Sequence, residues 1–239
     1  MQPDQMTPQP TVTRATTYDA GLRAHFQKVY NTMSLGLLVT GGVAFGVSNS
    51  PALMEMIFGN KIIALLVMFA PMAFLWFGFN ANSMMRKSVA EISTMFYALS
   101  AVWGLSLSFI FLAYTATDIA RVFFITAGMF AGTSVYGYTT KKDLSGMGGM
   151  MVMGMIGLII ASLVNLFLQS TMVQFVTSVC AVIIYTGLVA WNTQQIKESY
   201  NATYGGEANG KMAVMGALQL YVDFIGLFMS LLQLLGNRR

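Results

Sequence analysis

Residues 144–196 read LSGMGGMMVMGMIGLIIASLVNLFLQSTMVQFVTSVCAVIIYTGLVAWNTQQI and contain no Asp, Glu, Lys or Arg. A membrane-spanning helix needs only about 20 mainly apolar residues. This block of 53 residues is therefore long enough for two spans and the turn between them. Backbone amides and carbonyls inside a bilayer must all be hydrogen-bonded, and these segments are about twice as long as a barrel strand and lack its alternation. They are therefore expected to be helices.

Long uncharged stretches of this kind extend over most of the chain. Charged residues make up 9% of the 239 residues and hydrophobic residues 56%, whereas an average soluble domain has about 25% charged residues. The pattern predicts an all-α integral membrane protein with seven transmembrane helices. The predicted spans are Val29–Ser48, Lys61–Phe79, Ile92–Ala113, Ile119–Tyr138, Met150–Leu168, Met172–Trp191 and Lys211–Leu235.

The N-terminal residues differ from the rest of the chain. Residues 1–27 are rich in Thr, Gln and Pro and contain no apolar run, which predicts a polar tail that is disordered or lies on the surface. The first apolar stretch starts at Val29 and is a full span long, so it does not have the form of a cleaved signal peptide. We expect residues 28–237 to form the transmembrane domain.

The orientation follows from the positions of Lys and Arg. With a cytoplasmic N-terminus, nine Lys and Arg residues fall on the cytoplasmic side and four on the other side. Cytoplasmic connections carry the excess of positive charge, so the N-terminus is predicted to be inside. Arg238 and Arg239 are the exception, and a re-entrant last segment would bring them to the cytoplasm.

Several function classes lack their characteristic residues in this sequence. Cys180 and His25 are the sole residues of their types, so an intramolecular disulfide or a multi-cysteine zinc site is excluded. The sequence has no phosphate-binding glycine loop, no zinc-protease motif and no serine elbow. We therefore expect no enzyme, no resident metal and no cofactor. The net charge of +4 arises from residues at the ends of apolar blocks, which indicates membrane orientation and not nucleic-acid binding.

Asp223 is the most informative single residue. It lies near the middle of the otherwise uncharged stretch 212–237, where a carboxyl costs about 2.5 to 3.5 kcal/mol on insertion scales. It is either an ion or proton site facing the bundle interior or a structural carboxyl bonded to a neighbouring helix. Polar residues that could support it are Asn192 and Gln195, near the end of the sixth span, and Gln219, one turn earlier on the same helix.

Small residues are spread through the spans. Examples are Gly41, Gly42 and the pair Gly128 and Gly132, which are four residues apart. Small residues allow helix backbones to approach closely in lipid. We expect them to support a compact bundle.

Four stretches together resemble the transmembrane Bax inhibitor motif family. These stretches are residues 136–145 (YGYTTKKDLS), 192–197 (NTQQIK), 217–225 (ALQLYVDFI) and 231–236 (LLQLLG). The resemblance is strongest over the last 105 residues and extends, through the seven-span layout, to nearly the whole chain. The short tails are typical of a bacterial-type member.

The resemblance implies two three-helix layers around a central seventh helix, and a calcium leak gated by protonation. In bacterial members the gate is described as a pair of aspartates with an arginine after the second span. Asp223 matches the seventh-span aspartate and Arg86 the arginine, but Asn192 stands where the sixth-span aspartate is expected. Because an amide does not titrate, this departure removes one acidic group and the partner of Arg86.

The resulting prediction is a pH-influenced calcium leak channel in the bacterial inner membrane, with Asp223, Asn192 and Arg86 at the ion pathway. Calcium would be bound only transiently, and the lipid bilayer is the other expected partner. The alternative is a non-conducting regulator that binds a membrane-embedded quality-control protease, with the polar tail as the contact. No nucleic-acid partner is predicted.

Overall fold

The structure is a computed structural model that describes residues 11–80 and 86–237, with the backbone alone for residues 11–17. Every secondary-structure element in these ranges is a helix, and seven helices are long and apolar enough to cross a membrane. The predicted fold class is confirmed. The helices are α1 (Thr11–Ser48), α2 (Pro51–Phe58), α3 (Lys61–Gly78), α5 (Val89–Leu107), α6 (Ile110–Ala113), α7 (Ala116–Thr139), α8 (Ser145–Leu168), α9 (Thr171–Ser199) and α10 (Gly206–Leu235).

The first helix begins earlier than the apolar pattern predicts. It starts at Thr11 and not at Val29, so most of the expected polar tail is helical. Leu22 and Phe26 recur at helical spacing with Val29 and are buried in the core. The polar residues between them hide this amphipathic face from a search for apolar runs. Residues 1–10 of the expected tail lie outside the described residues.

The sixth and seventh spans also extend further than predicted. Helix α9 continues to Ser199, which places Asn192 and Gln195 within the helix and not at its end. Helix α10 runs without interruption from Gly206 to Leu235. Its 30 residues correspond to about 45 Å, more than the roughly 30 Å of a bilayer core. A re-entrant segment would need a turn that α10 does not have.

The turn predicted within residues 144–196 lies between Leu168 and Thr171. Gln169 adopts a left-handed conformation with φ of 49°, which ends α8. The side-chain oxygen of Asn165 accepts a hydrogen bond from the backbone N–H of Ser170 at 3.0 Å. Left-handed residues commonly end helices, and the Asn165 side chain stabilises the tight reversal into α9.

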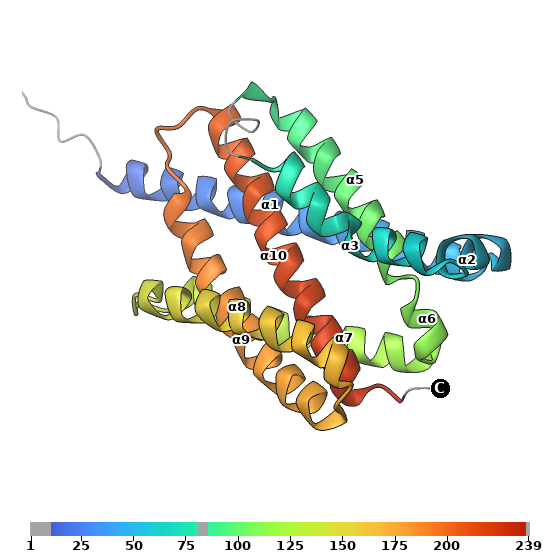
Figure 1. The fold of residues 1–239 in the computed structure, drawn as a ribbon. Coiled ribbons are helices and arrows are strands. Elements are labelled where there is room, and N and C mark those ends of the chain that lie inside the picture. Colours follow the sequence, from blue (N-terminus) through green and yellow to red (C-terminus); the bar gives the residue numbers. More distant parts are fainter. Residues whose placement is uncertain (1–10, 81–85, 238–239) are drawn as a thin grey trace, which may run out of the picture.

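Six of the seven long helices form two groups, and the seventh, α10, lies between them. Helices α1 and α3 pack against α5, helices α7 and α8 pack against α9, and α10 contacts both groups (Figure 1). Helix α10 supplies several of the largest fully buried side chains in the core between the two groups, such as Tyr221, Leu227 and Leu232. The seventh span is therefore the central helix of the bundle.

Helices α3 and α8 lie at the periphery of the bundle. They are among the most hydropathic spans and the least buried, and large side chains such as Trp76, Phe77 and Phe167 are exposed on them. Exposed apolar faces of this size are expected where a helix meets lipid. Since α3 and α8 face outward and α10 is the most buried span, polar side chains shielded from lipid are expected mainly along α10.

Candidate functional site

A hydrogen bond joins α9 and α10 inside the bundle. The Nδ2 group of Asn192 donates to Oδ2 of Asp223 at 2.6 Å, and these residues are 8% and 3% exposed. A buried carboxyl needs hydrogen-bond partners because removal from water is costly. The structure therefore places together the two residues that the sequence singled out on the sixth and seventh spans.

Tyr185 lies on the face of α9 that carries Asn192, two turns earlier. Its ring packs against Gly226 of α10, where an added Cβ would lie 2.1 Å from the ring carbon Cζ. Only a glycine leaves room for the ring at this point. The packing also brings the Tyr185 phenol within electrostatic reach of Asp223.

A second polar contact fixes α10 to the other helix group. The hydroxyl of Tyr221 lies 2.6 Å from Oγ1 of Thr40, and Oγ1 lies 2.9 Å from the carbonyl oxygens of Gly36 and Ser100. Because a hydroxyl carries one hydrogen, Tyr221 donates to Thr40, which donates to a backbone carbonyl. This arrangement connects α10 with α1 and α5, and the sequence analysis did not identify it.

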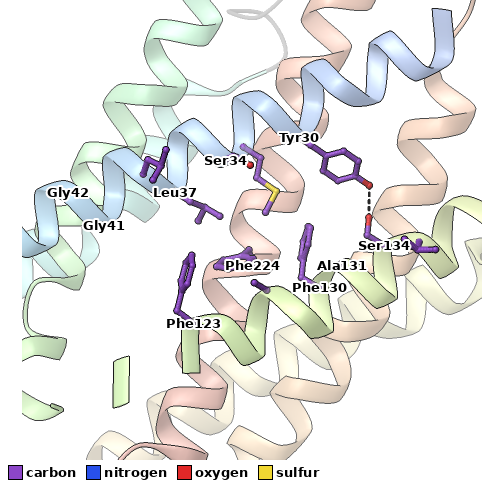
Figure 2. A pocket seen from close by; sticks show the side chains of 14 residues that line it. Tyr30, Ser34, Leu37, Gly41, Gly42, Phe123, Phe130, Ala131, Ser134 and Phe224 are labelled. Atoms are coloured by element: carbon purple, nitrogen blue, oxygen red, sulfur yellow. Dashed lines mark hydrogen bonds between the residues drawn. The ribbon is translucent and has the colours of Figure 1, made fainter. Parts of the chain in front are cut away.

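Three hydroxyl groups form a chain between α1, α7 and α9. The hydroxyl of Tyr30 lies 2.6 Å from Oγ of Ser134, which lies 2.9 Å from Oγ1 of Thr193. Thr193 in turn donates to the Val189 carbonyl oxygen at 2.7 Å. Figure 2 shows Tyr30 and Ser134 reaching toward each other across the space between α1 and α7. The chain ends at the residue next to Asn192.

The connection between α7 and α8 is held by α9. Gln194 is buried, and its Oε1 accepts from the backbone N–H of Leu144 while its Nε2 donates to the Lys142 carbonyl, both at 2.8 Å. Lys197 donates to the Tyr138 carbonyl oxygen at 2.8 Å. Residues 136–145 and 192–197, two of the stretches that carry the family resemblance, are therefore in direct contact.

Asp143 lies in this connection, outside the membrane-spanning helices. Its Oδ1 accepts a hydrogen bond from the backbone N–H of Ser145 at 2.8 Å. This backbone hydrogen bond favours the carboxylate and lowers the pKa of Asp143 below its ordinary value. The carboxylate thereby supports the first turn of α8.

The other predicted site residues lie apart from Asp223. Arg86 is exposed, directly after residues 81–85, which are outside the described residues. Gln219 is also exposed. Four residues correspond to slightly more than one helical turn, so the Gln219 side chain is rotated by about 40° around α10 relative to that of Asp223. Gln195 is half-buried. The structure thus joins Asp223 to Asn192, but not to Arg86, Gln195 or Gln219.

Two of the cavities beside α10 differ in their lining. The first has a volume of about 760 Å³ and lies between α1 and α7, with Phe224 of α10 among its lining residues (Figure 2). Its lining is mainly apolar, with Tyr30 and Ser134 among the few polar residues. The second, of about 440 Å³, lies between α3 and α5 on one side and α8, α9 and α10 on the other. Hydroxyl and amide side chains are more numerous in the second cavity.

No group of three or more His, Cys, Asp or Glu side chains that could hold a metal ion occurs in the part of the chain that the structure describes. Among the described side chains, Asp223 on the central helix is the one buried carboxyl. Seven apolar helices, with a buried acid on the central one, define a multi-pass membrane protein.

Comparison with known proteins identifies the family. A family model described as "Inhibitor of apoptosis-promoting Bax1" matches residues 22–239. The chain is 42% identical over 223 residues to the inner membrane protein YbhL of Escherichia coli strain K12, covering 92% of this chain and 94% of YbhL. It is 42% identical over 229 residues to an uncharacterised protein of Rickettsia prowazekii, covering 96% of each. The chain belongs to the Bax inhibitor-1 family, as the sequence resemblance predicted.

Proposed function

We propose that the protein is a cation leak pathway of a bacterial inner membrane and that calcium passes through the bundle beside Asp223. The observation that carries this proposal is the 3% exposed carboxyl of Asp223 on the central helix, bonded to the neutral amide of Asn192. Ionisable residues inside membrane proteins usually face the interior and mark ion or proton pathways. An acid used only for structure could be replaced by a neutral side chain at lower cost.

The charge of Asp223 is not neutralised by a basic partner in the described residues. The salt bridge found in those residues joins Lys211 and Glu207 on the first turns of α10, three to four turns from Asp223. A carboxylate without a protein cation attracts a passing cation more strongly than one in an ion pair. Calcium prefers oxygen ligands, which carboxylate, hydroxyl and carbonyl groups provide. We expect transient binding without a resident metal or cofactor.

The proposal also includes a location in the cell and a response of the flux to pH. The relative YbhL is named an inner membrane protein, and the distribution of Lys and Arg favours a cytoplasmic N-terminus. Asn192 cannot take up a proton at neutral pH, so Asp223 is the single titrating member of the pair. Protonation of Asp223 removes the charge that attracts the cation. We therefore propose that flux falls in one simple step as the pH decreases.

Calcium flux from purified protein in liposomes tests the proposal. Asp223→Asn removes the charge with little change in shape and is expected to reduce flux strongly while the protein remains folded. Glu55→Gln is the matched control, because it removes one acid from an exposed position on the short helix α2. Unchanged flux in Asp223→Asn would assign the carboxyl a structural role. Wild-type flux equal to that of empty liposomes would instead favour a non-conducting regulator of a membrane protease.

A further inference from the structure

The second cavity has polar residues on two facing helices. Ser178 and Tyr185 line it from α9, and Ser230 and Gln233 line it from α10. Ser178 donates to Oε1 of Gln233 at 2.9 Å, so the two helices are joined across the cavity wall. These side chains are in the halves of α9 and α10 that lie toward the C-terminal end of α10.

The polar residues continue toward the Asn192–Asp223 pair. Ser178, Tyr185 and Asn192 are seven residues apart and therefore lie on one face of α9. Asp223, Gly226 and Ser230 share a face of α10 in the same way. The two faces meet, because Asn192 bonds Asp223 and the Tyr185 ring covers Gly226. A polar track thus leads from the cavity to the buried carboxyl.

Thr177 and Ser230 in this lining already donate to carbonyl oxygens of their own helices, and their hydroxyl oxygens can still accept hydrogen bonds from water. Polar side chains at membrane depth face either other polar groups or water-filled cavities, because acyl chains offer no hydrogen bonds. Trp103 of α5 also lines the cavity, and its inaccessible indole N–H has no hydrogen-bond partner in the described part of the chain. Because this nitrogen is inaccessible, water in the cavity would reach it only if the indole ring moved, so the case for water comes from the hydroxyl and amide side chains of the lining.

Tyr185 is the cavity-lining residue of α9 that is nearest in sequence to Asn192, and on α10 the lining reaches Val222, next to Asp223. The Tyr185 ring stands against the backbone of α10 at Gly226, three residues beyond Asp223, and so lies between the polar lining and the Asn192–Asp223 pair. The contact is tight, because the ring packs directly on the Gly226 backbone and leaves no space for a Cβ atom. Movement of this one ring would connect the cavity with the buried carboxyl.

We propose that this cavity is a water-filled vestibule that extends from the side of the membrane where α10 ends and that Tyr185 closes its inner end. That cations use the vestibule rests on the proposed function. The rim includes apolar residues of α3 and α8 such as Phe69 and Leu163, so a lipid tail is the competing occupant. A cysteine thiol placed in the cavity can ionise if the cavity holds water, but ionises poorly if it holds a lipid tail.

Thiol reactivity in proteoliposomes measures the occupant, because the thiolate is the nucleophile and forms poorly in apolar surroundings. Ser230→Cys and Thr177→Cys, each in a Cys180→Ala background, place one thiol in the cavity. Native Cys180 is the matched control, since it is exposed on α9 and does not line the cavity. Reaction with a membrane-impermeant methanethiosulfonate should be at least about tenfold faster at positions 230 and 177 than at Cys180. Equal, slow reaction at all three positions would show a lipid-filled crevice and overturn the vestibule.

Substitution of Tyr185 tests the closure. Asp223→Cys in the Cys180→Ala background should react slowly, and adding Tyr185→Ala should accelerate its reaction by about tenfold or more. Tyr185→Phe retains the ring and should leave the reaction slow, which also shows that a change at this position permits folding. Failure of Tyr185→Ala to accelerate the reaction, in protein that remains monodisperse, would overturn the role of Tyr185.

Flux separates this inference from the proposed function. With Asp223 present, Tyr185→Ala should raise calcium flux and Tyr185→Phe should not. Reactive thiols at positions 230 and 177 without calcium flux in any variant would support the vestibule and overturn the leak pathway. Flux that depends on Asp223 while these thiols stay unreactive would support the leak pathway and overturn the vestibule.

Discussion

The amide nitrogen of Asn192 lies 2.6 Å from Oδ2 of Asp223, so α9 and α10 meet at an amide and a carboxyl where the family resemblance implies two carboxyls. The geometry is that of a direct hydrogen bond, and both side chains are buried. An amide can donate to the carboxyl but cannot share a titrating proton with it. Asn192 therefore keeps the contact between α9 and α10, but an amide stands in place of one of the two carboxyls that the resemblance implies.

Asn192→Asp should restore a coupled pair of acids. Two carboxyls at this distance cannot both be ionised without repulsion, and the singly protonated form is stabilised by the shared proton. The pH dependence of calcium flux in proteoliposomes should become steeper than in the parent, or split into two steps more than about one pH unit apart.

Two controls define the origin of that change. Gln195→Glu adds an acid on the same turn of α9 without the contact to Asp223, and should leave the shape of the profile unchanged. Arg86 is exposed, so Arg86→Ala should have no effect on the Asn192→Asp profile. Identical profiles for the parent and Asn192→Asp would show that the two side chains do not meet, and a lost response in Arg86→Ala would show that the arginine reaches the pair.

Gly137 should be intolerant of any side chain. A Cβ at this position would lie 2.3 Å from the backbone oxygen of Ala190, so Gly137→Ala must push α7 away from α9. Overpacking of this kind costs about 1–3 kcal/mol. Gly132 on the same helix has nothing within 4 Å of its added Cβ, so Gly132→Ala is the matched control and should not destabilise the protein. Thermal unfolding in detergent compares the two, and equal melting temperatures would contradict the close contact.

Gln194 should hold the connection between α7 and α8. Gln194→Ala leaves the N–H of Leu144 and the carbonyl of Lys142 without their partner, which costs about 1–3 kcal/mol for each group that stays buried. The amide of Leu144 should then exchange its hydrogen faster in a hydrogen–deuterium exchange experiment. Gln195→Ala, at the neighbouring half-buried position, should leave this exchange unchanged. The same exchange rate in both variants would mean that the connection is held by other contacts.

The topology gives a further expectation. The Lys and Arg distribution favours a cytoplasmic N-terminus, and the uninterrupted α10 makes the seventh span a full crossing. A reporter fused at Met1 should therefore be cytoplasmic and one fused after Arg239 should be outside. A cytoplasmic signal from the C-terminal reporter would require α10 to leave the membrane on the side where it begins.

The spans and the buried acid could be predicted because each depends on a local property of the chain. Uncharged blocks of span length indicate helices whatever their neighbours, and a single Asp223 within such a block is conspicuous. The early start of α1 was missed because Leu22 and Phe26 are scattered among polar residues. The small residues differ in role: Gly41, Gly42, Gly128 and Gly132 have open space at their Cβ positions, whereas Gly154, another of the small residues spread through the spans, packs against Ile184 of α9, and Gly137 makes a close contact with the α9 backbone.

The partners within the bundle could not be predicted in the same way. Thr40 and Tyr221 are 181 residues apart, and nothing in either local sequence indicates that their hydroxyls meet. Gln194 and Gln195 are neighbours of the same type, yet only Gln194 is turned toward the α7–α8 connection. Gln219 shares an approximate face with Asp223, but the neighbouring helices do not cover it. These outcomes depend on how α10 is oriented between the two helix groups.

The unequal burial of the helices bears on how the protein is made. The peripheral α8 has the highest mean hydropathy of the seven spans, so it can enter the membrane without help from other segments. Helix α10 carries Asp223, is the most buried span and is the last to be synthesised. Until it arrives, Asn192 and Thr40 have no partner on the central helix. Thr40 can still donate to the Gly36 or Ser100 carbonyl, but the Asn192 amide waits without its partner, so a chain that stops before α10 should be a substrate for membrane quality control.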